Sequence, residues 1–126
     1  MQKKILIIED DVVLIEVLAT KVKSLNYIVV QAKNGEEGIA KLAQEKPDLI
    51  LLDVILPLKS GFEVLEEIKG KQKSTVPVII LSNLDSPQEI EKGMKLGAVD
   101  YMIKSNFSLH EIMSKIAKYL PTPLVV

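Results

Sequence analysis

Four acidic residues of this sequence stand directly after short apolar runs. Glu9, Asp10 and Asp11 come directly after the first run, and Asp53 comes directly after the third. If the runs are neighbouring parallel strands, these carboxylates meet at one edge of the sheet, where they repel unless a cation joins them. Mg²⁺ prefers such oxygen ligands. We therefore predict a magnesium site made by Glu9, Asp10 and Asp53, and we interpret Asp11 as a helix N-cap.

Asp53 is also a candidate nucleophile. A carboxylate beside a metal ion can attack phosphorus and form an aspartyl phosphate. Ser82 follows the fourth apolar run and Lys104 follows the fifth, so both are expected at the same edge of the sheet. The lysine can neutralise charge on a transferring phosphoryl group, and the serine hydroxyl can donate a hydrogen bond to it.

Other chemistries are excluded by composition. The 126 residues include no cysteine, which removes disulfides, zinc–thiolate sites and cysteine catalysis. The single histidine, His110, falls in the first turn of the last predicted helix, away from the strand ends, so a Ser-His-Asp triad lacks its geometry. No glycine-rich phosphate-binding loop is present. No apolar run reaches the roughly 20 residues of a membrane span, and the net charge of -1 creates no field toward nucleic acid.

Five short apolar runs alternate with segments of helical periodicity. Three of the runs lack polar alternation, which is typical of parallel strands covered on both faces. A polar residue, Asp100, interrupts the fifth run and favours an edge strand. The predicted strands are Ile5–Ile8, Tyr27–Val30, Leu49–Leu52, Val76–Leu81 and Val99–Ile103.

Four of the helices are predicted from their caps. Asn34, Ser60, Ser86 and Ser108 are each followed three residues later by glutamate, as in a capping box. The helix before Asn34 has an apolar face made by Leu14, Leu18, Val22 and Leu25. The expected helix or segment ends are Asn26, Pro47, Gly70, Gly97 and Pro121.

The βα alternation predicts an α/β fold. We expect a doubly wound, five-stranded parallel sheet of the flavodoxin-like (βα)5 type, with strand order 2-1-3-4-5. Ligands bind such sheets beyond the carboxyl ends of the strands, where the strand order reverses. We expect residues 1–120 to form one domain and residues 121–126 to be a C-terminal tail or the stub of a linker.

Several of these segments together resemble the receiver domain of two-component response regulators. The resemblance covers residues from Lys3 to about Leu120. Its motifs are Ile5–Asp11, Leu52–Pro57 with Gly61, Ile80–Ser82 and Gly97–Lys104. These five matches, four segments and one glycine, come in order at the expected spacings, which makes chance an unsatisfactory explanation.

The resemblance implies a role for each site residue. Asp53 would accept a phosphoryl group from a sensor histidine kinase or a phosphotransfer protein. Asp10 would bind Mg²⁺ directly, Glu9 through water, and the backbone carbonyl of Ile55 would complete the metal site. Lys104 would pair with the phosphoryl oxygens. Two further residues would form the switch, namely Ser82 and Tyr101.

The resemblance also implies partners and a setting. The fourth helix, fifth strand and fifth helix would form the face that a downstream protein reads. The domain would be a cytoplasmic signalling switch rather than an enzyme, catalysing only its own phosphotransfer and dephosphorylation, and would contact neither nucleic acid nor membrane. It would be monomeric before phosphorylation, with dimerisation open afterwards.

Three residues depart from the family pattern. Ser105 replaces the proline that usually follows the lysine, so we expect a trans peptide there, because a non-proline cis bond costs about 2.5–4 kcal/mol. Asn83 stands where a small residue is usual, and Ser82 replaces threonine. Asn83 and Ser105 keep open a receiver-like interaction module that no longer depends on phosphate, whereas the intact Glu9, Asp10, Asp53, Ser82 and Lys104 argue against it.

Two alternatives of other classes fit less well. A Mg²⁺-dependent aspartyl-phosphate phosphatase of the haloacid-dehalogenase type needs a second aspartate two residues after the nucleophile, where this chain has Ile55. A flavodoxin-like flavin carrier needs a phosphate-binding loop after the first strand, where three acids stand instead.

Overall fold

The computed structural model describes residues 2–120, in which helices cover both faces of one parallel sheet. The strands are β1 (Lys4–Ile8), β2 (Ile28–Ala32), β3 (Leu49–Leu52), β4 (Val78–Ser82) and β5 (Asp100–Ile103). The helices are α1 (Val12–Ser24), α2 (Gly35–Glu45), α3 (Gly61–Lys69), α4 (Pro87–Lys95) and α5 (Leu109–Tyr119), with a 3₁₀ turn η1 (Lys104–Asn106) before α5. The predicted tail 121–126 lies outside the described residues.

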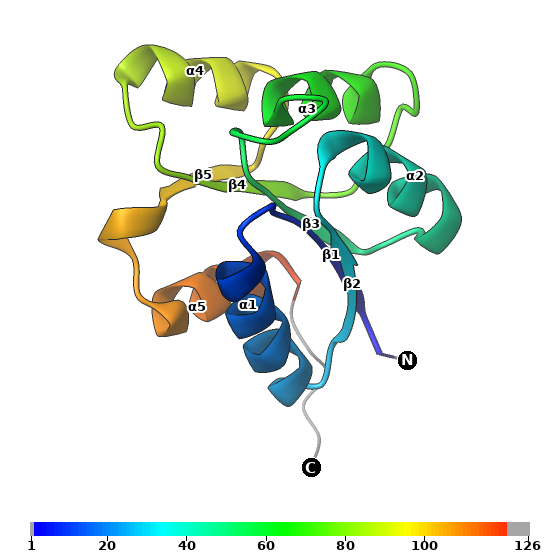
Figure 1. Ribbon diagram of the computed structural model, residues 1–126, viewed down its shortest axis with the longest axis vertical. Helices are drawn as coiled ribbons and strands as arrows, with labels where there is room; N and C mark the ends of the chain where they lie inside the picture. The colour runs from blue at the N-terminus through cyan, green and yellow to red at the C-terminus, as the bar shows by residue number, and fades with distance from the viewer. Residues whose placement is uncertain (1, 121–126) are drawn as a thin grey trace.

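The strand order is β2-β1-β3-β4-β5, as predicted. Helices α1 and α5 lie on one side of the sheet, and α2, α3 and α4 lie on the other (Figure 1). The side chains of β1 alternate between the two sides, so Ile5 and Ile7 enter the core under α1 and α5, whereas Leu6 and Ile8 enter the core under α2 and α3. Both faces of the central strands are therefore buried.

Three of the strands begin later than predicted, while β1 begins one residue earlier and β2 and β4 extend beyond their predicted ends. Tyr27 precedes β2, because its amide donates to the Val22 carbonyl at the end of α1 (3.4 Å) instead of entering the sheet. The fourth strand begins at Val78 because Pro77 has no N–H for the ladder. The fifth begins at Asp100 rather than Val99, and it is an edge strand as predicted.

The predicted caps are present at the helix starts. The side chains of Asn34, Ser60, Ser86 and Ser108 each accept a hydrogen bond from the amide three residues later. The complete, reciprocal capping box occurs at Ser60 and Ser108. The predicted apolar face of α1 was wrong at Leu25, which is 39% exposed because the helix ends before it.

The described helices are short. Among residues 2–120, none combines the length and apolar character that a membrane crossing demands.

Candidate functional site

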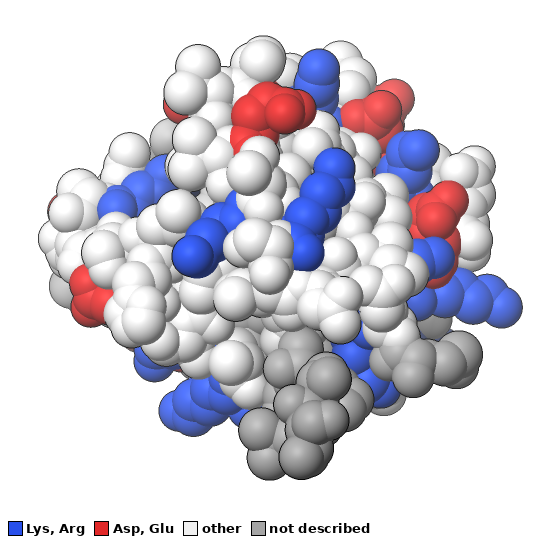
Figure 2. Space-filling model, turned by 90° about the horizontal axis from the view of Figure 1, so that it is seen from below, with Lys and Arg blue, Asp and Glu red and all other residues white. Residues whose placement is uncertain are grey.

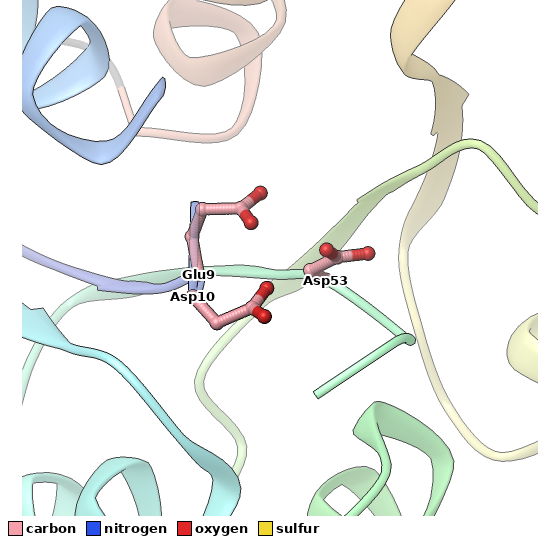
Figure 3. Close-up of side chains that lie close together, drawn as sticks. All are labelled: Glu9, Asp10 and Asp53. Carbon is pink, nitrogen blue, oxygen red and sulfur yellow. The ribbon is translucent and has the colours of Figure 1, made fainter. Parts of the chain in front are cut away.

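The ends of β1 and β3 bring three carboxylates together. Glu9 and Asp10 follow β1, Asp53 follows β3, and each offers an oxygen within 4.8 Å of the others. The carboxylates of Glu9 and Asp10 point to the side on which Asp53 lies (Figure 3). Glu9 and Asp53 are only 3% and 5% exposed, whereas Asp10 is exposed. The cluster is therefore closed on the core side and open to solvent through Asp10.

The backbone of both strand ends is held by the sheet. The Glu9 amide donates to the Ala32 carbonyl and the Asp53 amide donates to the Ile8 carbonyl, each at 3.0 Å. These bonds continue the parallel ladders one residue beyond the strands. The two buried carboxylates are consequently placed by the rigid part of the fold rather than by a loop.

Asp11 is the N-cap of α1, as predicted from the sequence. Its carboxylate accepts from the amides of Val13 and Leu14 at 3.0 and 3.1 Å, which caps α1. Its own amide donates to Glu9 at 3.1 Å. Asp11 therefore starts the helix and orients a neighbour of the cluster, and its carboxylate is used by the helix.

Lys104 reaches across the strand ends to two of the carboxylates. Its ammonium nitrogen lies 2.6 Å from Glu9 Oε1 and 2.9 Å from Asp53 Oδ2. Burial alone would lower the pKa of Lys104, but hydrogen bonds to Glu9 and Asp53 outweigh it, so the pKa is raised. Sequence placed this lysine at the site but gave no signal for its bond to Glu9, because a long flexible side chain can reach several acids.

The ionised form of Glu9 is still disfavoured, although Lys104 lies beside it. Burial raises the pKa of Glu9, and the charge of Asp53 adds to that rise, while Lys104 and the Asp11 amide oppose it. With three carboxylates and one ammonium, the cluster keeps an excess of negative charge. A further cation would relieve that excess.

Ser82 and Tyr101 meet at one residue of the loop between β4 and α4. The fully buried Ser82 hydroxyl accepts from the Leu84 amide at 3.4 Å. The half-buried Tyr101 donates its hydroxyl to the Leu84 carbonyl at 2.7 Å. Leu84 therefore connects the two side chains through its backbone. The sequence could not predict this, because any residue at position 84 has the same backbone groups.

The remaining predicted positions surround the cluster. The Ile55 amide donates to Asp53 Oδ1 at 3.3 Å, and its side chain is 58% exposed. Asn83 is exposed. No described peptide bond is cis, which agrees with the trans bond expected before Ser105.

Comparison with known protein families shows to which family the chain belongs. Residues 5–117 match the family described as the response regulator receiver domain. The chain belongs to this family. Receivers are the signalling switches of two-component systems, they bind Mg²⁺ at an acidic pocket, and they interact with histidine kinases and downstream effectors.

Two curated relatives from Bacillus subtilis (strain 168) resemble this receiver along most of its length. The alkaline phosphatase synthesis transcriptional regulatory protein PhoP is 38% identical over 95% of this chain and 49% of its own. The probable C4-dicarboxylate response regulator DctR is 40% identical over 92% of this chain and 51% of its own. The chain thus spans about half the length of the curated relatives it matches.

Solved receivers share the fold. The BeF3-activated N-terminal receiver domain of RstA from Klebsiella pneumoniae is 28% identical, with a TM-score of 0.87, covering 95% of this chain and 100% of that one. A CheY-like receiver from Methanospirillum hungatei JF-1 is 27% identical, with a TM-score of 0.88, over 94% and 93% of the two chains. Membership in this family replaces the phosphatase and flavin-carrier interpretations.

Proposed function

We propose that Asp53 is the phosphoacceptor of this receiver. The observation that carries the proposal is its placement: a carboxylate 5% exposed, at the end of the central strand, 2.9 Å from the ammonium of Lys104. The donor would be a phosphohistidine of a sensor histidine kinase or of a phosphotransfer protein. A bond forms between Asp53 Oδ and phosphorus, the phosphorus–nitrogen bond breaks, and its electron pair leaves with the imidazole.

The donor set fits Mg²⁺. The cluster offers carboxylate oxygens and neither sulfur nor imidazole, which matches a hard divalent cation. Asp10 and Asp53 would bind the ion directly, Ile55 would add its backbone carbonyl, and Glu9 would act through water. Bound there, Mg²⁺ would neutralise charge on the phosphoryl oxygens.

Lys104 and Ser82 would hold the phosphorylated state. A phosphoryl group adds negative charge beside an ammonium that already lies between Glu9 and Asp53, so Lys104 would turn from Glu9 to the phosphoryl oxygens. Ser82 would exchange its contact with the Leu84 amide for a phosphoryl oxygen. Because Tyr101 bonds the same Leu84, that exchange would reach the β4–α4 loop.

The output would be read on the α4-β5-α5 face. Tyr101 lies on β5, and its loop contact, Leu84, lies three residues before the start of α4, so a change at Ser82 has a short route to this face. A downstream protein would bind there. The domain would act as a switch rather than an enzyme, with residues 1–120 as its unit, and any dimer would form after phosphorylation.

The phosphodonor would approach over apolar residues around the acidic pocket. Val12 and Val13, at the start of α1, are 57% and 74% exposed, and Ile55 and Leu58, after β3, are 58% and 71% exposed. On the side of α1 and α5, the surface consists mostly of residues other than lysine, aspartate and glutamate, with charged side chains scattered over it (Figure 2). Such a surface favours contact with a partner protein around the point of transfer.

Labelling with acetyl phosphate and Mg²⁺, read by intact mass, tests this function. Wild type should gain one phosphoryl group, and Asp53→Asn should not. Asp11→Asn is the matched control, because asparagine caps a helix as well as aspartate does, so this variant should still label. Excess chelator should prevent labelling of wild type. Labelling of Asp53→Asn at the wild-type rate would refute the assignment, and no labelling of wild type would favour the phosphate-independent interaction module.

A further inference from the structure

The first residue of α3 lies directly on the peptide that carries Asp53. The Gly61 amide donates to the Val54 carbonyl at 2.7 Å. A Cβ built on Gly61 would lie 2.1 Å from the Asp53 carbonyl oxygen and 2.6 Å from Val54 Cα. Both neighbours are backbone atoms, which cannot rotate away as the end of a side chain can. A side chain at position 61 would therefore force one segment to move.

Two anchors decide what moves. Helix α3 is held by four apolar side chains of the buried core, namely Phe62, Val64, Leu65 and Ile68. On the other side, the Asp53 amide is bonded to Ile8, but the chain beyond Asp53 leaves the sheet. The Asp53–Val54 peptide has fewer anchors, namely the Asp53 amide bond to Ile8 and the buried side chain of Val54, so it is the part expected to shift.

The same short segment carries the reacting carboxylate and its orienting contact. The Ile55 amide donates to Asp53 Oδ1 at 3.3 Å, and Lys104 bonds Asp53 Oδ2 at 2.9 Å. A shift of the Asp53–Val54 peptide would change both distances together. It would also move the Ile55 carbonyl that is proposed for the metal site.

We propose that Gly61 is a positioning residue for the phosphoacceptor. It touches no reacting atom; by having no side chain, it lets α3 rest on the Asp53–Val54 peptide and fixes the direction of the Asp53 carboxylate. This inference rests on the proposed function of Asp53. Phosphoryl transfer needs the attacking oxygen in line with the leaving group, and a misplacement of about 1 Å costs about 100-fold in rate.

Gly61→Ala tests this role with acetyl phosphate as the donor. In that reaction Asp53 Oδ bonds to phosphorus, the phosphorus–oxygen bond to the acetyl group breaks, and acetate leaves with the electron pair. We expect the maximal labelling rate at saturating donor and Mg²⁺ to fall about 10- to 100-fold. The donor concentration for half-maximal rate should change much less, since the positively charged groups around the pocket remain.

Two variants separate positioning from general stability. Gly38→Ala is the matched glycine control, because its Cβ would meet the flexible end of Ile8 (Cδ1 at 2.5 Å) rather than backbone. Ile68→Ala leaves a cavity at the far end of α3, so it destabilises the same helix without touching Asp53. Both should label at nearly the wild-type rate per folded molecule, with the folded fraction measured by circular dichroism.

Each outcome of the experiment decides the inference. A wild-type rate for Gly61→Ala would overturn it, as would an equal loss of rate in Ile68→Ala. If Gly61→Ala is partly unfolded, sucrose restores the folded state and the rate per folded molecule is compared there. Asp53→Asn runs in parallel: if wild type does not label at Asp53, the proposed function fails, whereas normal labelling of both wild type and Gly61→Ala refutes only the role of Gly61.

Discussion

Helices α3 and α4 have the same length and similar first turns, yet they are attached to the molecule very differently. Each has nine residues, follows a serine N-cap, and carries glutamate at its third position. In α4 the one buried residue is Gly93. In α3 five residues are buried, namely Gly61, Phe62, Val64, Leu65 and Ile68. Capping therefore starts both helices, whereas burial fixes only one of them.

The difference matches the work that each helix would do. Helix α3 rests on the peptide of the proposed phosphoacceptor, where movement would spoil the geometry of transfer. Helix α4 follows the loop that Ser82 and Tyr101 share, and a signal can be read there only if the helix can shift. Segments with few buried apolar contacts open at low free energy. The receiver thus combines a firmly packed helix beside the proposed phosphoacceptor with a lightly packed one at the proposed output face.

The largest expected effect compares core truncation in the two helices. Ile68→Ala removes a fully buried side chain from α3 and should lower the free energy of unfolding by about 2–5 kcal/mol. Met94→Ala, at a position of α4 that is 42% exposed, should change it by less than about 0.5 kcal/mol. Urea unfolding at constant m-value measures both. Similar losses in the two variants would remove the contrast on which the comparison rests.

Sequence predicted the attachment of neither helix, although it predicted both starts. Ser60 and Ser86 are caps because a short polar side chain finds its amide within one turn, which is a local matter. Whether a helix then buries five residues or one depends on the distance and tilt at which it meets the sheet. Those are set by side chains from other strands, such as Ile80 and Tyr101 under Gly93.

The candidate site likewise has features that could be predicted from the sequence and features that could not. That Glu9, Asp10 and Asp53 would gather could be predicted, because the carboxyl ends of parallel strands share one edge of the sheet. The bond between Lys104 and Glu9 could not be predicted, because it depends on a side-chain rotamer. The contacts of Ser82 and Tyr101 with Leu84 could not be predicted either, because they are made by backbone groups that every residue possesses. Tyr27 was assigned to a strand from its apolar neighbours, whereas its amide bonds to the end of α1.

A contact between the two helices gives the next prediction. The Lys92 ammonium of α4 lies 4.8 Å from the centre of the Phe62 ring of α3, a cation–π contact. Lys92→Gln should lower the free energy of unfolding by about 0.5–1 kcal/mol. Because α4 has little else to hold it, its amide hydrogens should exchange faster while those of α3 are unchanged. Lys95→Gln, on the same helix with an exposed partner, is the control; faster exchange in that variant too would mean that the ring contact is not what restrains α4.

Helix α5 is held by the buried residues Ile112, Met113 and Ile116, and it adds an electrostatic contact that depends on pH. Lys115 of α5 lies 3.0 Å from Asp100 of β5, and the Tyr119 hydroxyl donates to the same oxygen at 3.3 Å. Burial alone would raise the pKa of Asp100, but these bonds and the Tyr101 amide lower it below its ordinary 3.8. A lowered carboxyl pKa stabilises the fold above that ordinary value, and the stabilisation disappears as the pH falls through the lowered pKa.

Asp100→Asn should therefore lose about 0.5 kcal/mol of unfolding free energy near pH 6, a modest value because the pair is partly exposed. The difference from wild type should shrink as the pH is lowered below about 3.8. Urea unfolding at several pH values measures the difference. A gap between the two proteins that is the same at all pH values would show that Asp100 acts by packing and not by charge.

The smallest expected effect on stability comes from the glycine of α4. Alanine at position 93 should favour the helix by about 1 kcal/mol. Its Cβ would, however, lie 2.7 Å from Ile80 Cδ1 and 3.0 Å from Tyr101 Cδ2. The tyrosine ring can move outward, which weakens its 2.7 Å hydrogen bond to Leu84, a loss of about 0.5–1.5 kcal/mol. The two effects nearly cancel, so Gly93→Ala should change the free energy of unfolding by less than about 0.5 kcal/mol.

The ring movement has its own readout, which stability alone does not give. Burial raises the pKa of Tyr101, so a ring displaced toward solvent should titrate closer to the ordinary tyrosine value of 10.0, as followed by NMR of ¹³C-labelled tyrosine. If the Tyr101 pKa is unchanged and the free energy of unfolding rises by about 1 kcal/mol, the helix α4 has moved and not the tyrosine ring. At Gly61 of α3 the same added methyl group meets backbone instead of side-chain ends. One substitution in the two helices should therefore disturb the reacting group in the first case and the switch in the second.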